Sequence, residues 1–435
     1  MNTLRPFQLV LLAFFGLLAV IALIFLSLYQ ANKQSEKLAY GDRVQIWGTL
    51  PQDTFKQLFQ EITKTDKPFS AVEYRQFDER TFDDELVNAI AEQQSPDLIV
   101  LSSDALVSQR AKLFPIPYES FPVRDYKDTF IDGAELFMFA EGIYGIPFAI
   151  DPLVMYWNRD LLATNAIANP PRTWEEVVNV VVPKVSQKTD TREITQSGIA
   201  FGEYRNIENA KEILMMLALQ TGSRLTQAEE HKYLVALNEA QSDSVSRPFE
   251  SVLQFYTDFS NVNSPLYSWN RAVSSAKATF LGGDLALYFG KGSELRDIAD
   301  KNPNLNFDMA QVPQGANATV FRTYGMMYAF AIPKEASNPQ GAYAVARVLS
   351  GQAQAKALTE SLGMASVRRD LIRAGSDNAF MRVLQQSALI ARAWLDPQRT
   401  KSADIFKQMV EDVVSNRSRV GDAVGDAVDR LELVY

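Results

Sequence analysis

The chain of 435 residues contains no cysteine and a single histidine, His231. Without cysteine there can be no disulfide, no thiolate metal site, no cysteine nucleophile and no lipid-bearing N-terminal cysteine. One histidine excludes a paired-histidine metal site within the chain. We therefore expect no metal site, and nothing in the sequence indicates a cofactor.

Basic residues are outnumbered by acidic ones, 43 against 52, which gives a formal net charge of −9. An acidic chain is poorly suited to a phosphate backbone, so we expect no nucleic-acid partner. Hydrophobic residues make up 47% and charged residues 22% of the sequence, the composition of a folded protein. The length suits two or three domains.

The N-terminal region has no charge between Arg5 and Lys33, and every residue from Leu9 to Leu26 is apolar or glycine. A membrane-spanning helix needs about 20 such residues. A cleaved signal peptide is the alternative, but its apolar region is usually shorter. The segment therefore predicts a cytoplasmic arm at 1–6, a transmembrane anchor at 7–29 and a tether at 30–41, with the bulk of the chain outside a single-pass cell membrane.

The first part of the remaining chain alternates strand and helix patterns. Val44 and Ile46 alternate in a strand pattern, and a helix with one apolar face follows at 53–62. A second strand is predicted at 72–74 and a second helix at 82–90. The apolar run PDLIVL is typical of a strand buried on both faces of a parallel sheet. This order predicts an α/β fold.

Proline punctuates the middle of the chain. Pro147 and Pro152 break IYGIPFAIDPLVMYWNRDLL into two predicted extended stretches. Thr173 and Glu176 have the spacing of a helix-capping box. ATFLGGDLALYFG indicates a helix end, a glycine turn and a strand. Further helices are predicted at 207–219, 249–259, 340–349, 380–393, 403–415 and 421–433.

Two predicted strands end in side chains that could contact a ligand. Trp47 and Thr49 come after the first, and Ser102, Ser103 and Asp104 come after PDLIVL. Ligands of open α/β sheets bind at the carboxyl ends of strands. Ordinary helix capping is the alternative explanation for the serines and the aspartate. No nucleophile and base converge in the sequence, which disfavours an enzyme.

Several stretches resemble the extracellular solute-binding proteins of ABC importers, in the maltose-binding and glycerol-phosphate-binding group. The stretches are YGIPFAIDPLVMYWNRDLL with PPRTWEEVV, PDLIVLSSD, the region from AKATFLGGDLALYFGKGS to AQVPQ, and YAFAIPKEASNPQGAYAVARVLSG. The resemblance implies a two-lobed, periplasmic-binding-protein-like (type II) fold with a cleft between the lobes. Lobe 1 would comprise 42–148 and 318–360, lobe 2 would comprise 149–317 and 361–435, and the hinge would lie at Pro147–Asp151 and Pro313–Ala318.

Position within this resemblance also implies a set of ligand-binding residues. They are Trp47, Thr49, Asp104, Asp151, Tyr204, Arg322 and Tyr324, beside Ser102 and Ser103. Two tryptophans that sugar binders often carry are absent, because Leu101 and the Gly292–Glu294 turn stand in their places. Their absence disfavours an oligosaccharide ligand.

Together these features predict a membrane-tethered solute-binding protein and not an enzyme. It would capture a carbohydrate-like or polyol solute by lobe closure and deliver it to an ABC permease, with a monomeric ectodomain. The alternative is the ligand-binding ectodomain of a surface sensor that signals through a partner protein.

We predict that residues 7–29 remain attached in the mature protein, because the apolar run is long and no small-x-small cleavage site follows it. Mass spectrometry of the native protein measures the mature N-terminus. An N-terminus between Ala31 and Tyr40 would identify the segment as a signal peptide.

Overall fold

The computed structural model describes residues 40–41, 43–223, 225–228, 233–238 and 247–435. The predicted arm at 1–6, the predicted anchor at 7–29, nearly all of the tether at 30–41, and His231 lie outside the described residues. In the part that is described, no helix has the length and apolar character to cross a bilayer. The chain divides into two units: unit 1 is Met1–Leu98 with Glu335–Val348, and unit 2 is Ile99–Lys334 with Leu349–Tyr435.

Unit 1 is built on two parallel strands and an aromatic core. Strands β1 (Val44–Gly48) and β2 (Val72–Gln76) pair in parallel through helix α2 (Gln52–Thr65) and the 3₁₀ turn η1 (Lys67–Ala71). Phe55 of α2 stacks on Tyr74 of β2 with ring centroids 4.0 Å apart. Helices α3 (Phe82–Ala91) and α13 (Pro339–Leu349) complete the unit.

A buried aspartate joins the discontinuous segment of unit 1 to its first strand. Asp97 Oδ2 accepts a hydrogen bond from Gln45 N at 2.9 Å. Its Oδ1 accepts from Ser337 Oγ at 2.8 Å and from Asn338 N at 2.9 Å. Asn338 Nδ2 in turn donates to the Tyr40 carbonyl at 2.7 Å. One carboxylate therefore links two segments that are distant in sequence.

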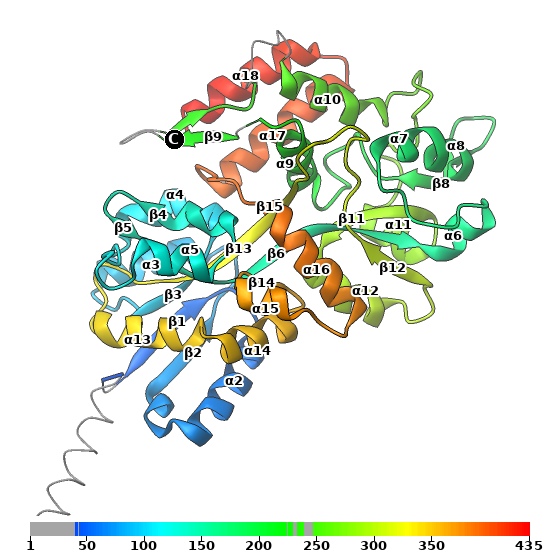
Figure 1. The fold of residues 1–435 in the computed structure, drawn as a ribbon. Helices are drawn as coiled ribbons and strands as arrows, with labels where there is room; N and C mark the ends of the chain where they lie inside the picture. The colour runs from blue at the N-terminus through cyan, green and yellow to red at the C-terminus, as the bar shows by residue number, and fades with distance from the viewer. Residues whose placement is uncertain (1–39, 42, 224, 229–232, 239–246) are drawn as a thin grey trace, which may run out of the picture. The chain divides into compact units, whose positions relative to one another are not determined.

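Unit 2 is organised around the long strand β6 (Ile146–Asn158), which Figure 1 shows between β13 and β11. Its first half pairs antiparallel with β13 (Thr323–Ala331) and β14 (Ala365–Ser366). Its second half pairs antiparallel with β11 (Leu285–Lys291) and β12 (Phe307–Ala310). On one side β13 continues the sheet to β3 (Leu98–Ser102), and on the other β11 continues it to β8 (Ile194–Ile199).

The remaining strands of unit 2 are short. They are β4 (Met138–Phe139), β5 (Gly142–Ile143), β7 (Gln187–Lys188), β9 (Thr226–Ala228), β10 (Tyr233–Val235) and β15 (Ala391–Arg392).

The helices of unit 2 cover the sheet. Those before β12 are α4 (Leu106–Gln109), α5 (Val123–Thr129), α6 (Arg159–Thr164), α7 (Trp174–Glu176), α8 (Val182–Val185), α9 (Ala210–Gln220), α10 (Pro248–Asp258) and α11 (Ala276–Gly282). Those from α12 onward are α12 (Leu295–Lys301), α14 (Gln352–Leu362), α15 (Arg369–Ala374), α16 (Ala379–Ile390), α17 (Arg399–Val414) and α18 (Val420–Glu432). A π-helical turn at Val177–Val181 joins α7 to α8.

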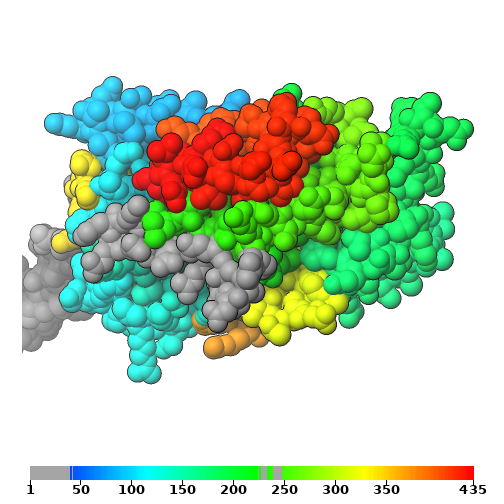
Figure 2. Space-filling view, turned by 90° about the horizontal axis from the view of Figure 1, so that it is seen from above, coloured from blue at the N-terminus to red at the C-terminus, as the bar shows by residue number. Residues whose placement is uncertain are grey.

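The C-terminal helices pack on the middle of unit 2. Helices α17 and α18 contact each other and also α10, and the view from above shows α18 in red at the surface beside the green middle segment (Figure 2). Phe249 of α10 meets Phe406 of α17 edge to face, and Trp394 meets the same Phe406 ring. This aromatic contact joins α17 to α10, and α17 also contacts α9.

Most predicted elements are confirmed, including the capping box of Thr173 and Glu176 and the left-handed glycine, Gly283, that ends α11. Two expectations were wrong, and a third is confirmed only in part. Trp47 lies within β1 and not after it. Pro147 and Pro152 do not divide their region, because both lie inside the single strand β6. The PDLIVL strand is buried as expected, but its partner β13 in unit 2 is antiparallel, because that part of the sheet is mixed.

We predict that Gly202→Ala lowers the free energy of unfolding more than Gly222→Ala. Both glycines have positive φ, +99° and +82°, so each substitution costs about 1–2 kcal/mol of backbone strain. At Gly202 an added Cβ would also lie 2.6 Å from Ser260 N, which adds about 1–3 kcal/mol of overpacking, whereas nothing lies within 4 Å at Gly222. Denaturant unfolding of both variants measures the difference, and equal losses would contradict the steric explanation.

Candidate functional site

Ser102, Ser103 and Asp104 end strand β3 and begin the 3₁₀ turn η2 (Ser103–Ala105), and all three are buried. Ser103 Oγ accepts a hydrogen bond from Met327 N of β13 at 3.1 Å, so this serine supports the sheet. Arg399, at the start of α17, places Nε 3.0 Å from Asp104 Oδ2 and donates to Ser102 Oγ at 3.2 Å. A residue from the C-terminal part of the chain therefore connects two of the predicted site residues.

Asp104 is only half satisfied by these contacts. Its side chain is 4% exposed, and its second oxygen, Oδ1, is buried and accepts no hydrogen bond from any residue within the described ranges. A buried carboxylate oxygen without a donor costs free energy, roughly 1–3 kcal/mol or more when charged. Asp104 therefore has the capacity to accept a hydrogen bond from a solute.

Helix α9 brings two charged residues into the same region. Lys211 Nζ donates to Asp396 Oδ2 at 2.6 Å and to Ser402 Oγ at 3.1 Å, and this ion pair is buried. Burial raises the pKa of Asp396, although Lys211 opposes that rise. The pair fastens α9 to the segment that carries Arg399.

The neighbouring Glu212 faces Lys291, the last residue of β11, with Oε1 3.7 Å from Nζ. Burial alone would lower the pKa of Lys291. The negative charge of Glu212 outweighs that effect and holds the pKa of Lys291 above its usual value, with further contributions from Tyr328, Asp151 and Asp104. Within the described part of the chain, Lys291 Nζ donates no hydrogen bond, so its three donors remain available.

Tyr204 and Tyr324 lie in the same electrostatic environment. Burial is the main cause of the raised pKa of both hydroxyls, and Glu212 and Asp396 act on each of them. Asp104 acts on Tyr324 as well. Neither hydroxyl has a hydrogen-bond partner among the residues that the structure describes.

We call these six residues the central polar cluster: Asp104, Tyr204, Glu212, Lys291, Tyr324 and Arg399. Three of them, Asp104, Tyr204 and Tyr324, were predicted from the sequence. Glu212, Lys291 and Arg399 were not. A usable signal existed for Glu212, because Lys211 and Glu212 are the two charged residues of the largely apolar helix AKEILMMLALQ.

Asp151 lies next to this cluster but has partners for both of its oxygens. It is 2% exposed, and it accepts from Ser293 N at 3.0 Å and from Ser293 Oγ at 2.6 Å. Burial raises the pKa of Asp151 to about 6. The hydrogen bonds from Ser293 and the positive charge of Lys291 limit this rise. The Gly292–Glu294 turn thus holds a strand residue in place.

Arg322, also predicted as a ligand-binding residue, makes its hydrogen bonds with residues outside the central polar cluster. Its backbone N–H donates to Gln314 Oε1 at 3.0 Å, and its carbonyl accepts from the side chains of Gln314 and Gln220. Its guanidinium donates to the Phe321 carbonyl. Its charge acts on Asp132 and Arg392.

Trp47 and Thr49 belong to unit 1. The Trp47 side chain is packed: the residue is 8% exposed, its ring lies 4.6 Å from that of Phe77, and the Arg75 guanidinium lies 5.5 Å from its centroid. Thr49 follows β1 and is half-buried. The ligand contacts predicted for both residues remain predictions.

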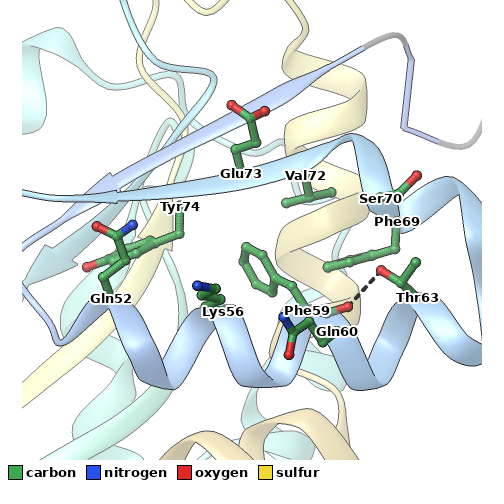
Figure 3. A pocket seen from close by; sticks show the side chains of 10 residues that line it. All are labelled: Gln52, Lys56, Phe59, Gln60, Thr63, Phe69, Ser70, Val72, Glu73 and Tyr74. Carbon is green, nitrogen blue, oxygen red and sulfur yellow. Dashed lines mark hydrogen bonds between the residues drawn. The ribbon is translucent and has the colours of Figure 1, made fainter.

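Unit 1 also has a hollow of about 570 Å³ between α2 and β2 (Figure 3). Phe59, Phe69 and Tyr74 line it with rings that belong to the core, as the close-up shows. Its polar residues Gln52 and Lys56 are exposed. The hollow has no buried polar group comparable with Asp104.

The described residues include no group of three or more histidine or acidic side chains arranged to hold a metal ion. What unit 2 concentrates is a set of hydrogen-bonding and charged groups at the ends of β3 and β11 and on α9. A mixed α/β sheet with such a set of groups at its strand ends is typical of ligand-binding proteins.

The family is established by comparison. A family model described as bacterial extracellular solute-binding protein matches residues 57–378, which is well over half of the chain. The chain belongs to this family and is a binding protein, not an enzyme, as the sequence predicted. A search of curated proteins found no significant match.

Solved structures with the same fold support the α/β periplasmic-binding-protein-like architecture. A cyclo/maltodextrin-binding protein complexed with maltotetraose has a TM-score of 0.71 at 15% identity, covering 90% of this chain and 96% of that chain. The cyclic α-maltosyl-1,6-maltose binding protein from Arthrobacter globiformis has a TM-score of 0.72 at 16% identity, covering 90% and 98%. An ABC transporter solute-binding protein from Thermotoga lettingae, bound with α-D-tagatose, has 0.64 at 18% identity, covering 91% and 100%.

We predict that Asp151 makes stability depend on pH. Its pKa rises from 3.8 to about 6 on folding, so the folded state favours the protonated form. The contribution of this group to stability is therefore greatest below about pH 4 and decreases as the pH rises through 6, by about 3 kcal/mol in total.

Asp151→Asn removes this titration. Denaturation at several pH values between about 4 and 7 measures the unfolding free energy of both proteins. As the pH rises, the native protein should lose about 3 kcal/mol of stability relative to the variant. A constant difference across this range would contradict the assignment.

Proposed function

We propose that this protein is the solute receptor of an ABC importer, held at the outer face of the cell membrane by its N-terminal segment. Family membership supports solute binding. The observation that carries the proposal within the chain is the central polar cluster. There, the buried Asp104 Oδ1 has no hydrogen-bond donor among the described residues, and Lys291 Nζ faces Glu212 Oε1 at 3.7 Å, beyond hydrogen-bond distance. Such groups bind a polar solute by exchanging water for solute hydroxyls.

We propose that the solute is a carbohydrate or a polyol. Among proteins of this fold, one is complexed with maltotetraose, one is bound with α-D-tagatose, and one is a cyclic α-maltosyl-1,6-maltose binding protein. Those proteins are at most 18% identical to this chain, so they support a class of solute and not a particular sugar. The tyrosines of the cluster supply rings and hydroxyls, although the tryptophan platforms expected for an oligosaccharide are missing.

We propose that capture is by closure of two lobes, lobe 1 at 42–148 and 318–360 and lobe 2 at 149–317 and 361–435. Rotation would be absorbed at Pro147–Asp151 and Pro313–Ala318. A solute that contacts both lobes stabilises the closed form by its difference in affinity for the two forms. The closed form would then be read by the permease.

Attachment to the membrane rests on the apolar run at 7–29. This run has the length of a spanning helix, and the chain has no cysteine that could carry a lipid instead. The second candidate function, the ectodomain of a sensor, shares the solute site and differs only in its partner.

A thermal-shift screen of the full-length chain tests solute binding. We expect a sugar or polyol to raise the melting temperature, because a solute that binds only the folded state stabilises it in proportion to the logarithm of its concentration. Sugars, polyols, phosphorylated glycerols and oligopeptides form the screen, and stabilisation by oligopeptides alone would contradict the solute class.

Trp47→Ala tests the predicted contribution of unit 1. If Trp47 forms a wall of the site, the variant should bind the solute more weakly by about 1–3 kcal/mol, measured by calorimetry at a temperature where both proteins are folded. A lower melting temperature with unchanged affinity would show that Trp47 only packs against Phe77, and would remove it from the site.

A further inference from the structure

We propose that the central polar cluster selects a solute that carries a protonated amine, such as an amino sugar, over the corresponding neutral or anionic solute. This inference rests on the proposed function, because it assumes that the cluster is the solute site. It goes further by assigning the charge of the solute from the balance of charges buried around Asp104.

The first observation is that the cluster has acceptor capacity inside the protein. Asp104 is held by Arg399 through one oxygen only, and its buried Oδ1 has no donor within the described ranges. Glu212 Oε1 lies 3.7 Å from Lys291 Nζ, which is longer than a hydrogen bond, so its carboxylate also retains acceptor sites. Hydroxyl and ammonium groups could both satisfy these oxygens.

The second observation is the balance between acidic and basic side chains in this region, and it favours an ammonium donor over a hydroxyl donor. Three ion pairs cancel: Asp104 with Arg399, Asp396 with Lys211, and Glu212 with Lys291. The fourth acid, Asp151, is 2% exposed; its hydrogen bonds come from the uncharged groups of Ser293, and Lys291 acts on it only as a charge at longer range. Of these four acids, Asp151 is the one that forms no ion pair with any residue in the described ranges, so it adds a buried negative charge to a region in which the other three acids are paired.

A buried charge without a counter-ion is costly, so a solute that supplies a positive charge gains more than a neutral one. A carboxylate or phosphate would add a second uncompensated negative charge. The surroundings of the two tyrosines also favour a positively charged solute. The charged groups that act on Tyr204 and Tyr324 are acids, namely Glu212, Asp396, Asp404 and Asp104. Tyrosine oxygens and rings also accommodate an ammonium group.

The test compares matched sugars on the full-length chain, solubilised in a detergent without a sugar head group. The probes are glucosamine, galactosamine and mannosamine, each with its N-acetylated form and its parent hexose, and glucuronate as the anion. N-acetylation keeps the size of the substituent but removes the charge. We expect at least one amine to raise the melting temperature, and its N-acetylated form, its parent hexose and glucuronate to have little effect.

Variants locate the effect. Glu212→Gln and Asp104→Asn each remove one negative charge from the cluster and should weaken binding of the amine about 10- to 100-fold by calorimetry, the usual effect of losing a hydrogen bond to a charged group. Two variants are needed because Asp104→Asn also leaves Arg399 without its counter-ion. Asp370→Asn is the matched control: Asp370 pairs with Arg368 at 2.6 Å outside the cluster, and its loss should leave binding unchanged.

The outcomes separate this inference from the proposed function. Stabilisation by a neutral hexose or by glucuronate equal to that by the amine would overturn the charge assignment and leave solute binding intact. Amine binding that is unaffected by both cluster variants would overturn the location. If neither these probes nor the wider solute screen stabilises the protein, the proposed function is contradicted together with the inference.

Discussion

Strand β6 is the constraint on which unit 2 depends, because its two halves pair with different strands. Residues 146–152 pair with β13, and residues 153–158 pair with β11 and β12. Proline cannot donate to a strand ladder, so its place in a central strand needs an explanation. Pro147 lies opposite Ala329, where the register of β13 shifts, and Pro152 pairs with Gly325 at the point where the pairing passes to β11. Both prolines therefore lie where the ladder is already irregular.

This arrangement also explains where the charged groups gather. Asp151 and Leu153 lie at the change of partner, and β11 ends at Lys291 directly opposite Leu153. The turn after β11 supplies Ser293 to Asp151, while α9 supplies Glu212 to Lys291. Buried charges persist only when they are paired or hydrogen-bonded. The cluster consequently depends on three segments that are far apart in the chain and are held together by packing of α9, α10 and α17.

Local patterns predicted much of the fold correctly. The capping box at Thr173 was readable because both of its partners lie within four residues, and α9, α10, α16, α17 and α18 were readable from their apolar spacing. The same reasoning failed at β6, because proline is a strong local signal for a break and only the partner strands show that the break is absent. It also missed α14, whose sequence QAQAKALTESL has a weak apolar face.

The sequence by itself determined the class of the protein: an α/β solute-binding protein without cysteine chemistry, with Asp104 at the end of a buried strand and a long apolar N-terminal run. Only the tertiary structure decided what Asp104 faces. Arg399 reaches it from α17, the charge of Asp104 acts on Lys291 at the end of β11, and Lys291 in turn faces Glu212 of α9. No local pattern encodes such a meeting. The physical reason is that the energy of a buried charge depends on which partners reach it in space, whereas a helix cap or a strand depends mainly on its neighbours in the chain.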